Sequence, residues 1–113
     1  MTKEEKTKML VTYICYPFDV PEFYTTDEFA RIMHAFYALS WVPILSMPYI
    51  APAKTNLLKV GMSHALILKC DQLAICHEEH TTSAMLREIN FAKANNVKVT
   101  RIYFKKKEDE EDE

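Results

Sequence analysis

Four short runs of β-branched and aromatic residues, separated by segments of helical length, constrain the fold of this chain more than any other feature. The first run (MLVTYICY) is ended by Pro17, as expected of a buried strand. The four runs cover residues 9–16, 41–46, 72–76 and 97–104. The connections between them are long enough for right-handed crossovers. The order β-α-β-α-β-α-β therefore predicts an α/β fold, in which helices cover both faces of a parallel sheet.

The segments between these strands carry the apolar spacing of helices. Thr25 and Glu28 fit a capping box at the start of the first helix. Phe29, Ile32 and Met33 then recur on one face of it. The helices are expected at 25–40, 55–70 and 82–95, and Pro-containing loops at 17–24 and 47–54.

The order of the strands decides where a ligand would bind. By analogy with flavodoxin-like folds, we expect a three-layer sandwich with a parallel sheet of four to five strands in the order 2-1-3-4. The carboxyl ends of the first and third strands then flank the point at which the strand order reverses, where α/β proteins bind ligands. The loops after Tyr16 and Cys76 should lie side by side there.

Composition and charge exclude several kinds of partner. The 113 residues are expected to form one domain at 9–104, with a flexible leader at 1–8 and a disordered charged tail at 105–113. Lys and Arg are scattered and the net charge is −2, which argues against a nucleic-acid partner. No apolar run approaches the roughly 18–20 residues of a membrane span, so we expect no membrane partner.

Glycine and cysteine usage narrows the chemistry further. Gly61 is the only glycine, so the chain has neither a GxGxxG dinucleotide motif nor a P-loop. The cysteines, Cys15, Cys70 and Cys76, are odd in number, contain no CxxC pair and lie in or beside apolar elements. We interpret them as reduced thiols of a cytoplasmic protein.

Glu88 is a carboxylate on a helix face that otherwise carries core residues. At about 100° per residue, Met85, Ile89 and Ala92 share this face with it, whereas Arg87 lies outside it. Burying an unpaired carboxylate costs several kcal/mol or raises its pKa until it is neutral. A chain that keeps such a group has a structural partner or a chemical use for it, so Glu88 is the first candidate for a functional residue.

Four motifs follow one another along the chain in a recognisable order. They are YICYPF at 13–18, WVPI at 41–44, GMSHALILKCDQLAI at 61–75 and TxAMxxExxxAK at 82–93. In this order they resemble small phage and bacterial proteins of the nucleoside 2-deoxyribosyltransferase-like superfamily, over about residues 10–104. The resemblance implies no cofactor, a homodimer or larger homo-oligomer, and a place in the cytoplasm of a bacterium or phage-infected cell.

The resemblance also implies a reaction, namely cleavage or transfer at the N-glycosidic bond of a 2′-deoxynucleoside or its 5′-monophosphate. Glu88 would be the nucleophile that attacks C1′ and displaces the base. The family pattern S/D-x-G-x-x-x-E puts Thr82 at its first position, either as a contact to a 5′-phosphate or as a plain N-cap. Two positions depart from the family. Its glycine is Ala84, and Ser63 stands where catalytic relatives place an Asp general acid.

His64 has two interpretations. It lies among Leu57, Val60, Gly61 and Leu68, on what the spacing predicts to be an apolar arc of the second helix. It is either an acid that replaces the missing Asp, because an imidazole transfers protons near neutral pH, or a core histidine with one backbone partner. The core histidine is the commoner case.

The end of the first strand lines the sugar and base pocket in the family that this chain resembles. Alternation places Tyr13 on one face of the sheet and Ile14 and Tyr16 on the other, so at least one tyrosine should be a core residue. Tyr16 is a candidate to orient the Glu88 carboxylate or to stack on a base. The expected substrate-binding residues are Tyr13, Tyr16, Pro17, Phe18, Tyr49, Ser63, His77, Thr82, Ser83 and Met85.

The segment CHEEH at 76–80 contains three metal-competent residues, Cys76, His77 and His80. It is not an HExxH motif and lacks a clear fourth ligand, so we expect no metal site. We interpret the segment as a polar lid whose imidazoles and carboxylates touch solvent or ligand. Asp71, which precedes the third strand, is interpreted as a helix-end or turn residue.

Two other functions are compatible with these residues. A protein on the same scaffold would bind a nucleotide or a nucleotide-derived signal without turnover, and the departures at Ala84 and Ser63 favour that reading. A protein-interaction module would carry a buried Glu88 that no cavity reaches. The fold alone does not choose among the three functions.

Overall fold

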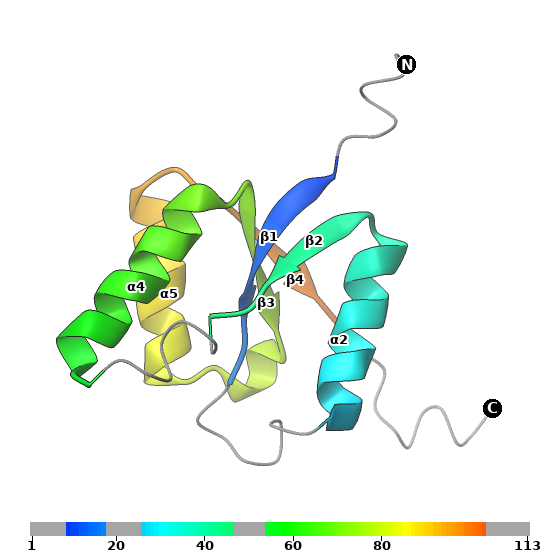
Figure 1. Ribbon diagram of the computed structural model, residues 1–113, viewed down its shortest axis with the longest axis horizontal. Coiled ribbons are helices and arrows are strands. Elements are labelled where there is room, and N and C mark those ends of the chain that lie inside the picture. Colours follow the sequence, from blue (N-terminus) through cyan, green and yellow to red (C-terminus); the bar gives the residue numbers. More distant parts are fainter. Residues whose placement is uncertain (1–8, 18–25, 47–53, 104–113) are drawn as a thin grey trace.

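A parallel four-stranded sheet forms the centre of the molecule (Figure 1). The computed structural model describes residues 9–17, 26–46 and 54–103. The strands are β1 (Leu10–Cys15), β2 (Trp41–Ile44), β3 (Gln72–Cys76) and β4 (Lys98–Ile102). Their order is β2-β1-β3-β4 and all neighbours are parallel, which confirms the predicted α/β fold and its strand order.

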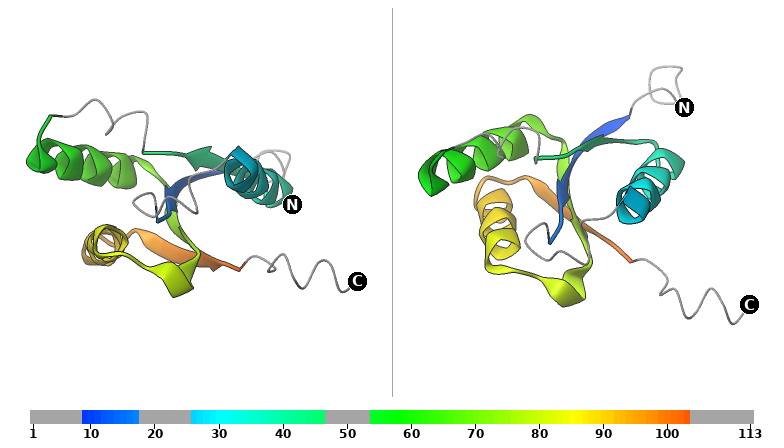
Figure 2. Two further views of the ribbon diagram at one scale, coloured as in Figure 1. Left: turned by 90° about the horizontal axis from the view of Figure 1, so that it is seen from below. Right: turned by 60° about the horizontal axis from the view of Figure 1, so that its bottom comes forward.

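Helices cover both faces of the sheet. They are α2 (Thr26–Ala38), α4 (Asn56–Lys69) and α5 (Ser83–Ala94), with a short 3₁₀ helix, η2 (Glu78–His80), between β3 and α5. Figure 2 shows α4 and α5 on one side of the sheet and α2 on the other, so the three-layer arrangement is confirmed.

Alternation along β1 and β3 divides the core into two clusters. Tyr13 and Cys15 face α4 and α5, whereas Ile14 and Tyr16 face α2, as predicted. The α4–α5 cluster is completed by Ile67, Leu73, Ile75, Met85, Ile89 and Ala92. The α2 cluster is completed by Ile32, Phe36, Ala74 and Cys76. Adjacent residues of β1 therefore belong to different layers, and only those of odd number face α4 and α5.

Polar side chains fix the beginnings of two helices at the predicted places. The Thr55 hydroxyl accepts a hydrogen bond from the Leu58 amide (3.1 Å), and the Thr82 hydroxyl accepts one from the Met85 amide (3.2 Å). Both threonines have the extended backbone of an N-cap. The predicted capping residue of the first helix, Thr25, lies outside the described residues.

β3 has the predicted bounds, whereas the other three strands are shorter than the sequence predicts. β2 ends at Ile44, which pairs with Tyr13 near the end of β1, and β4 ends at Ile102, which pairs with the last residue of β3. β2 is an edge strand and contains Pro43, opposite Thr12. Proline is tolerated at an edge because its missing N–H can face away from the sheet.

The buried face of α4 differs from the predicted one. Ser63 and Ile67 are buried, whereas Leu57 is 85% exposed and Leu68 is 55% exposed. The predicted apolar arc around His64 is therefore wrong. The helix is apolar on most sides, so its periodicity does not reveal which side faces the sheet.

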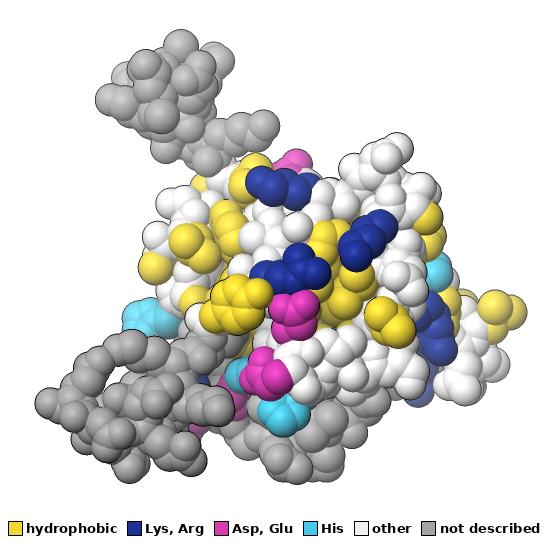
Figure 3. Space-filling view, turned by 180° about the vertical axis from the view of Figure 1, so that it is seen from behind, with side chains coloured by type: hydrophobic (Ala, Val, Ile, Leu, Met, Phe, Trp, Pro, Cys, Tyr) yellow, Lys and Arg dark blue, Asp and Glu magenta, His cyan; other side chains and the backbone are white. Residues whose placement is uncertain are grey.

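The surface opposite the view of Figure 1 carries mixed side chains. Figure 3 shows Lys and Arg side chains separated by apolar and neutral atoms on this face, without a continuous basic patch. Among the described helices, none has both the length and the apolarity that a membrane span requires.

A buried polar ladder crosses the sheet on the side of α2. Gln72 is 1% exposed, and its amide nitrogen donates to the Thr12 hydroxyl (2.9 Å). Its amide oxygen accepts from the Thr100 hydroxyl (2.9 Å), so one side chain connects β1, β3 and β4. Asp71 supports the start of the same strands by accepting a hydrogen bond from the Val11 amide (2.8 Å), in agreement with a structural role.

Replacement of Gln72 by leucine should destabilise the protein. The change removes the acceptor of the half-buried Thr100 hydroxyl, and it leaves the buried Thr12 hydroxyl with only its hydrogen bond to the Leu10 carbonyl. An unsatisfied buried group typically costs about 1–3 kcal/mol. Urea denaturation of the Gln72→Leu variant should give a lower midpoint with an unchanged slope. The exposed Asn90 (Asn90→Leu) is the control, and an unchanged midpoint for Gln72→Leu would show that the ladder contributes nothing.

Candidate functional site

Glu88 meets Tyr13 between the sheet and the α4–α5 layer. Tyr13 is fully buried in β1, and its hydroxyl donates a hydrogen bond to Glu88 Oε2. Glu88 lies on the inner side of α5, one turn before Ala92, and its side chain is partly buried. The Glu88 carboxylate therefore has a specific partner and is partly shielded from water, as its position on the helix predicted.

Burial and hydrogen bonding act in opposite directions on the Glu88 carboxylate. Burial raises the pKa of Glu88 above its usual range, while hydrogen bonding with Tyr13, Ser63 and Cys15, and then the charge of the Arg87 guanidinium, lower it in part. Burial and the nearby Glu88 carboxylate raise the pKa of the Tyr13 phenol strongly, so Tyr13 stays protonated and remains the donor. All three hydrogen-bonding groups are uncharged.

Ser63 and Ser46 complete this cluster from two further elements. Ser63 comes from α4 and is 6% exposed, and its single hydroxyl hydrogen serves either Glu88 or the Val60 carbonyl (3.3 Å). Ser46 follows β2, is 1% exposed, and its hydroxyl interacts with that of Tyr13. Sequence analysis predicted Ser63 but missed Ser46. The feature that could have identified Ser46 is its position directly after β2, beside the carboxyl end of β1.

The first turn of α5 lies next to this cluster along the chain. Thr82 is the N-cap, so one of its two predicted roles is observed. Ser83 is exposed at the first helical position, and Ala84 is exposed after it. Met85 is 1% exposed, and its carbonyl oxygen accepts a hydrogen bond from the Cys15 thiol (3.7 Å between sulfur and oxygen). Met85 is thus a core residue, whereas Ser83 is accessible to a ligand.

His64 does not join the carboxylate cluster through any contact among the described residues. Its ring stacks on Phe91 of α5, with 3.8 Å between centroids and 8° between planes. Burial, and then the nearby Arg87 guanidinium, lower the pKa of His64. Its Nε2 is buried and has no hydrogen-bond partner in the described part of the chain. His64 therefore packs as a neutral aromatic ring between two helices.

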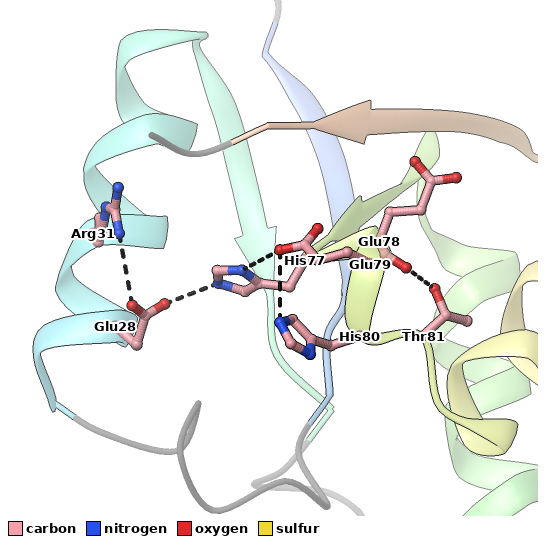
Figure 4. A network of polar contacts seen from close by, with 7 residues as sticks. All are labelled: Glu28, Arg31, His77, Glu78, Glu79, His80 and Thr81. Atoms are coloured by element: carbon pink, nitrogen blue, oxygen red, sulfur yellow. Dashed lines mark hydrogen bonds and ion pairs between the residues drawn. The ribbon is translucent and has the colours of Figure 1, made fainter. Parts of the chain in front are cut away.

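A second polar cluster lies on the α2 side, at the carboxyl end of β3. His77 is 9% exposed and has a left-handed backbone (φ 57°). Figure 4 shows its ring between Glu28 and Glu79, with Nε2 2.9 Å from Glu28 Oε2 and Nδ1 3.8 Å from Glu79 Oε1. His80 lies 3.9 Å from Glu79. The segment predicted to be a polar lid therefore includes one buried residue, His77, which connects the start of η2 to α2 through Glu28.

The remaining predicted residues are divided between the two faces of the sheet. Tyr16 is 2% exposed and packs on Phe29 and edge-on against His77, so Tyr13 rather than Tyr16 contacts Glu88. Pro17 is fully buried at the end of β1. Phe18 and Tyr49 lie outside the described residues.

The cysteines and acidic residues offer neither a reactive thiol nor a metal site where the structure describes them. All three cysteines are free thiols. Burial raises the pKa of Cys70 to about 11 and that of Cys76 to about 12, so both stay protonated near neutral pH. No group of three or more His, Cys, Asp or Glu side chains in residues 9–17, 26–46 and 54–103 is arranged to hold a metal ion.

Comparison of the chain with protein-family models, with curated proteins and with solved structures found no match. The interpretation of the site therefore depends on its own geometry and on the motifs of the sequence.

The raised pKa of Glu88 predicts a specific dependence of stability on pH. The folded protein holds the Glu88 proton more tightly than the unfolded chain does, so this stabilisation is complete below the unfolded pKa. It is lost as the pH rises through the folded pKa. Between the pKa of Glu88 in the unfolded chain and its pKa in the folded protein, the unfolding free energies of wild type and Glu88→Gln should diverge with pH. The divergence should be at most about 1.4 kcal/mol per pH unit.

Urea denaturation between about pH 4 and about pH 8 measures this difference. Asp27→Asn, at an exposed carboxylate of α2, is the control and should follow wild type throughout. A constant difference between wild type and Glu88→Gln over this pH range would contradict a raised pKa for Glu88.

Proposed function

We propose that this protein cleaves or transfers at the N-glycosidic bond of a 2′-deoxynucleoside or its 5′-monophosphate, with Glu88 as the nucleophile. The observation that carries the proposal is the partly buried Glu88 carboxylate, which accepts a hydrogen bond from the Tyr13 hydroxyl. The order of the sequence motifs supports the same chemistry.

The reaction would take place in two steps. A Glu88 oxygen forms a bond to C1′ while the N-glycosidic bond breaks, and the bonding electrons leave on the base nitrogen, which takes a proton from water. Water or a second base then attacks C1′ and gives up a proton to the hydroxide left by the first step, while the bond to Glu88 breaks and the carboxylate is restored. A hydrolytic turnover yields deoxyribose and free base, and a transfer exchanges one base for another.

The surroundings of Glu88 suit such a nucleophile. The Tyr13 hydroxyl orients the carboxylate and, like the nearby Arg87 guanidinium, favours its negatively charged form, against burial, which raises its pKa. That charge would stabilise the positive charge that develops at C1′ in the transition state. Partial burial strengthens this electrostatic interaction because less water screens it.

Protonation of the departing base is the weak point of the proposed chemistry. Ser63 cannot act as a carboxylic acid, and the His64 ring is stacked on Phe91. With water as the proton source, bases that depart readily should be the better substrates. The same observation favours a second candidate function, binding of a nucleoside or nucleotide without turnover.

A 5′-phosphate would find its place at the N-terminus of α5. The dipole of α5 favours an anion at its N-terminus, and the exposed hydroxyl of Ser83 could donate to it there. This expectation rests on the motif that ends in Glu88, and it applies equally to an enzyme and to a binding protein in the cytoplasm.

Replacement of Glu88 by glutamine should abolish the activity and keep the fold. The amide has the same shape but cannot attack C1′, so base release should fall by roughly a thousandfold or more. Purified protein is incubated with a panel of deoxynucleosides and their 5′-monophosphates, and free base is measured by chromatography. Asp27→Asn is the matched control. Undiminished release by Glu88→Gln would exclude Glu88 as the nucleophile.

The same panel of deoxynucleosides and 5′-monophosphates distinguishes catalysis from binding without turnover and from a protein-interaction role. Thermal stabilisation by a nucleotide without base release would establish the binding function, because a ligand that prefers the folded state raises its stability. If the wild type neither releases base nor is stabilised, a protein-interaction module is the account that the fold supports.

Replacement of Tyr13 by phenylalanine should shift the pH dependence of the reaction. The hydroxyl stabilises the charged form of Glu88, and hydrogen bonds to charged groups contribute about 1.5–3 kcal/mol. Its loss should raise the pKa of Glu88 further, so activity should appear only at higher pH. The acidic limb of the pH–rate profile measures this shift.

Tyr16→Phe is the control for Tyr13→Phe, because Tyr16 lies on the other face of the sheet. An unchanged acidic limb in Tyr13→Phe would show that this hydroxyl does not influence the reacting carboxylate.

A further inference from the structure

Ser46, directly after β2, carries a buried hydroxyl that the proposed reaction does not use. The residue is only 1% exposed. A buried hydroxyl is costly unless it has a hydrogen-bond partner. The place of Ser46 in the fold and the partner of its hydroxyl therefore indicate what this side chain does.

The pairing of β2 with β1 places Ser46 on the same side of the sheet as Tyr13. Ile44 pairs with Tyr13 and packs against the α4–α5 cluster, whereas Leu45 packs against the α2 cluster. Alternation returns the next residue, Ser46, to the side of α4 and α5. On that side the Ser46 hydroxyl forms a hydrogen bond with the Tyr13 hydroxyl.

The direction of this hydrogen bond follows from the number of hydrogens. Tyr13 has one hydroxyl hydrogen, and it is donated to Glu88 Oε2. The Tyr13 oxygen is therefore the acceptor, and the Ser46 hydroxyl is the donor. In agreement with this direction, Ser46 opposes the rise in the pKa of Tyr13 that burial and Glu88 cause. A chain of two hydrogen bonds thus runs from Ser46 through Tyr13 to Glu88.

The other two side chains that hydrogen-bond with Glu88 each have a second acceptor. The Ser63 hydroxyl lies 3.3 Å from the Val60 carbonyl oxygen, and the Cys15 sulfur lies 3.7 Å from the Met85 carbonyl oxygen. Each group has a single hydrogen, which serves either the carbonyl or Glu88.

Tyr13 differs from these two groups because a donor lies beside its oxygen. A hydroxyl rotates to suit its neighbours. The hydrogen of Ser46 opposes the orientation in which the Tyr13 hydrogen points toward Ser46, so the Tyr13 hydrogen stays directed at Glu88.

We propose that Ser46 is a positioning residue for Glu88, which acts by holding the Tyr13 hydroxyl in the orientation that donates to the carboxylate. Each hydrogen bond in such a chain polarises the next one and strengthens it. The bond to Glu88 gains most when Glu88 is ionised, because the acceptor then carries the charge. Ser46 therefore favours the ionised carboxylate through the residue between them. Its part in catalysis rests on the proposed function, whereas the hydrogen-bond chain does not.

NMR titration of the Glu88 side-chain carboxyl tests this role without a substrate. The full chain is labelled in its glutamate carboxyl groups, and the Glu88 signal is assigned by its loss in Glu88→Gln. In Ser46→Ala the midpoint should move to higher pH than in wild type, because the ionised form loses part of its stabilisation. The other titratable or charged groups near Glu88, which are Tyr13, Cys15 and Arg87, are unchanged in this variant.

Two conservative variants separate the hydroxyl from the packing of the side chain. Ser46→Thr retains the donor and should bring the Glu88 midpoint back toward the wild-type value. Ser46→Cys has a weaker donor of similar size and should give a shift in the same direction as Ser46→Ala.

A double-mutant cycle with Tyr13→Phe shows whether Ser46 acts through Tyr13. In the Tyr13→Phe background, Ser46→Ala should leave the Glu88 midpoint where it is. Thr12→Val is the control, because Thr12 is a buried hydroxyl residue next to Tyr13 that faces the side of α2, and its loss should not move the midpoint. An unchanged midpoint in Ser46→Ala, or the same shift in both backgrounds, would overturn the proposal.

The rate of base release gives a second readout, which depends on the proposed function. The acidic limb of the pH–rate profile of Ser46→Ala should move in the same direction as the NMR midpoint. If the wild type releases no base, the proposed function fails, and the NMR titration still decides the role of Ser46. An acidic limb that stays in place while the NMR midpoint moves would overturn the part of Ser46 in the reaction and would count against Glu88 as the nucleophile.

Discussion

The pairing of β1 with β3 is the constraint on which the rest of the molecule depends. Helices cover this pair on both sides, and its register places Tyr13 beside Leu73 and Ile14 beside Ala74. A slip of one residue would move Tyr13 to the side of α2 and separate it from Glu88. Burial on both faces makes such a slip costly, because each face would lose its apolar contacts. The polar ladder through Gln72 opposes the same slip, since only one register satisfies both of its hydrogen bonds.

Glu88 shows how a fold holds a carboxyl group in a partly buried place. Burial disfavours the ionised carboxylate, whereas hydrogen bonding and the nearby Arg87 guanidinium recover part of that cost. A direct salt bridge would stabilise the carboxylate more strongly. Under the proposed function, such a salt bridge would also cancel the field that a cationic transition state needs, so the arrangement would be a compromise between stability and reactivity.

The sequence predicted the elements of the fold well, because its strongest signals are local. Apolar runs marked the strands, and Thr55 and Thr82 marked helix starts that the structure confirms. The special position of Glu88 was also visible, because one helix face is clearly apolar around it. These predictions needed only the period of each element and the chemistry of its ends.

What the sequence did not reveal depends on the orientation of elements in space. The apolar residues of α4 surround the helix, so their spacing did not show that Ser63 faces the sheet and Leu57 faces solvent. The role of Ser46 follows from the pairing of β2 with β1, which no local pattern encodes. The burial of His77 likewise depends on Glu28, which is 49 residues away in the chain.

Pro43 has a consequence for how the sheet can grow. Because proline has no N–H to donate, a further strand beside β2 would lack a hydrogen bond at the middle of this short edge. The β4 edge has no proline and carries Lys98 and Arg101, whose charges discourage unselective pairing without removing any backbone donor. The two edges of the sheet therefore differ: an added strand would lose a hydrogen bond beside β2 that it would not lose beside β4.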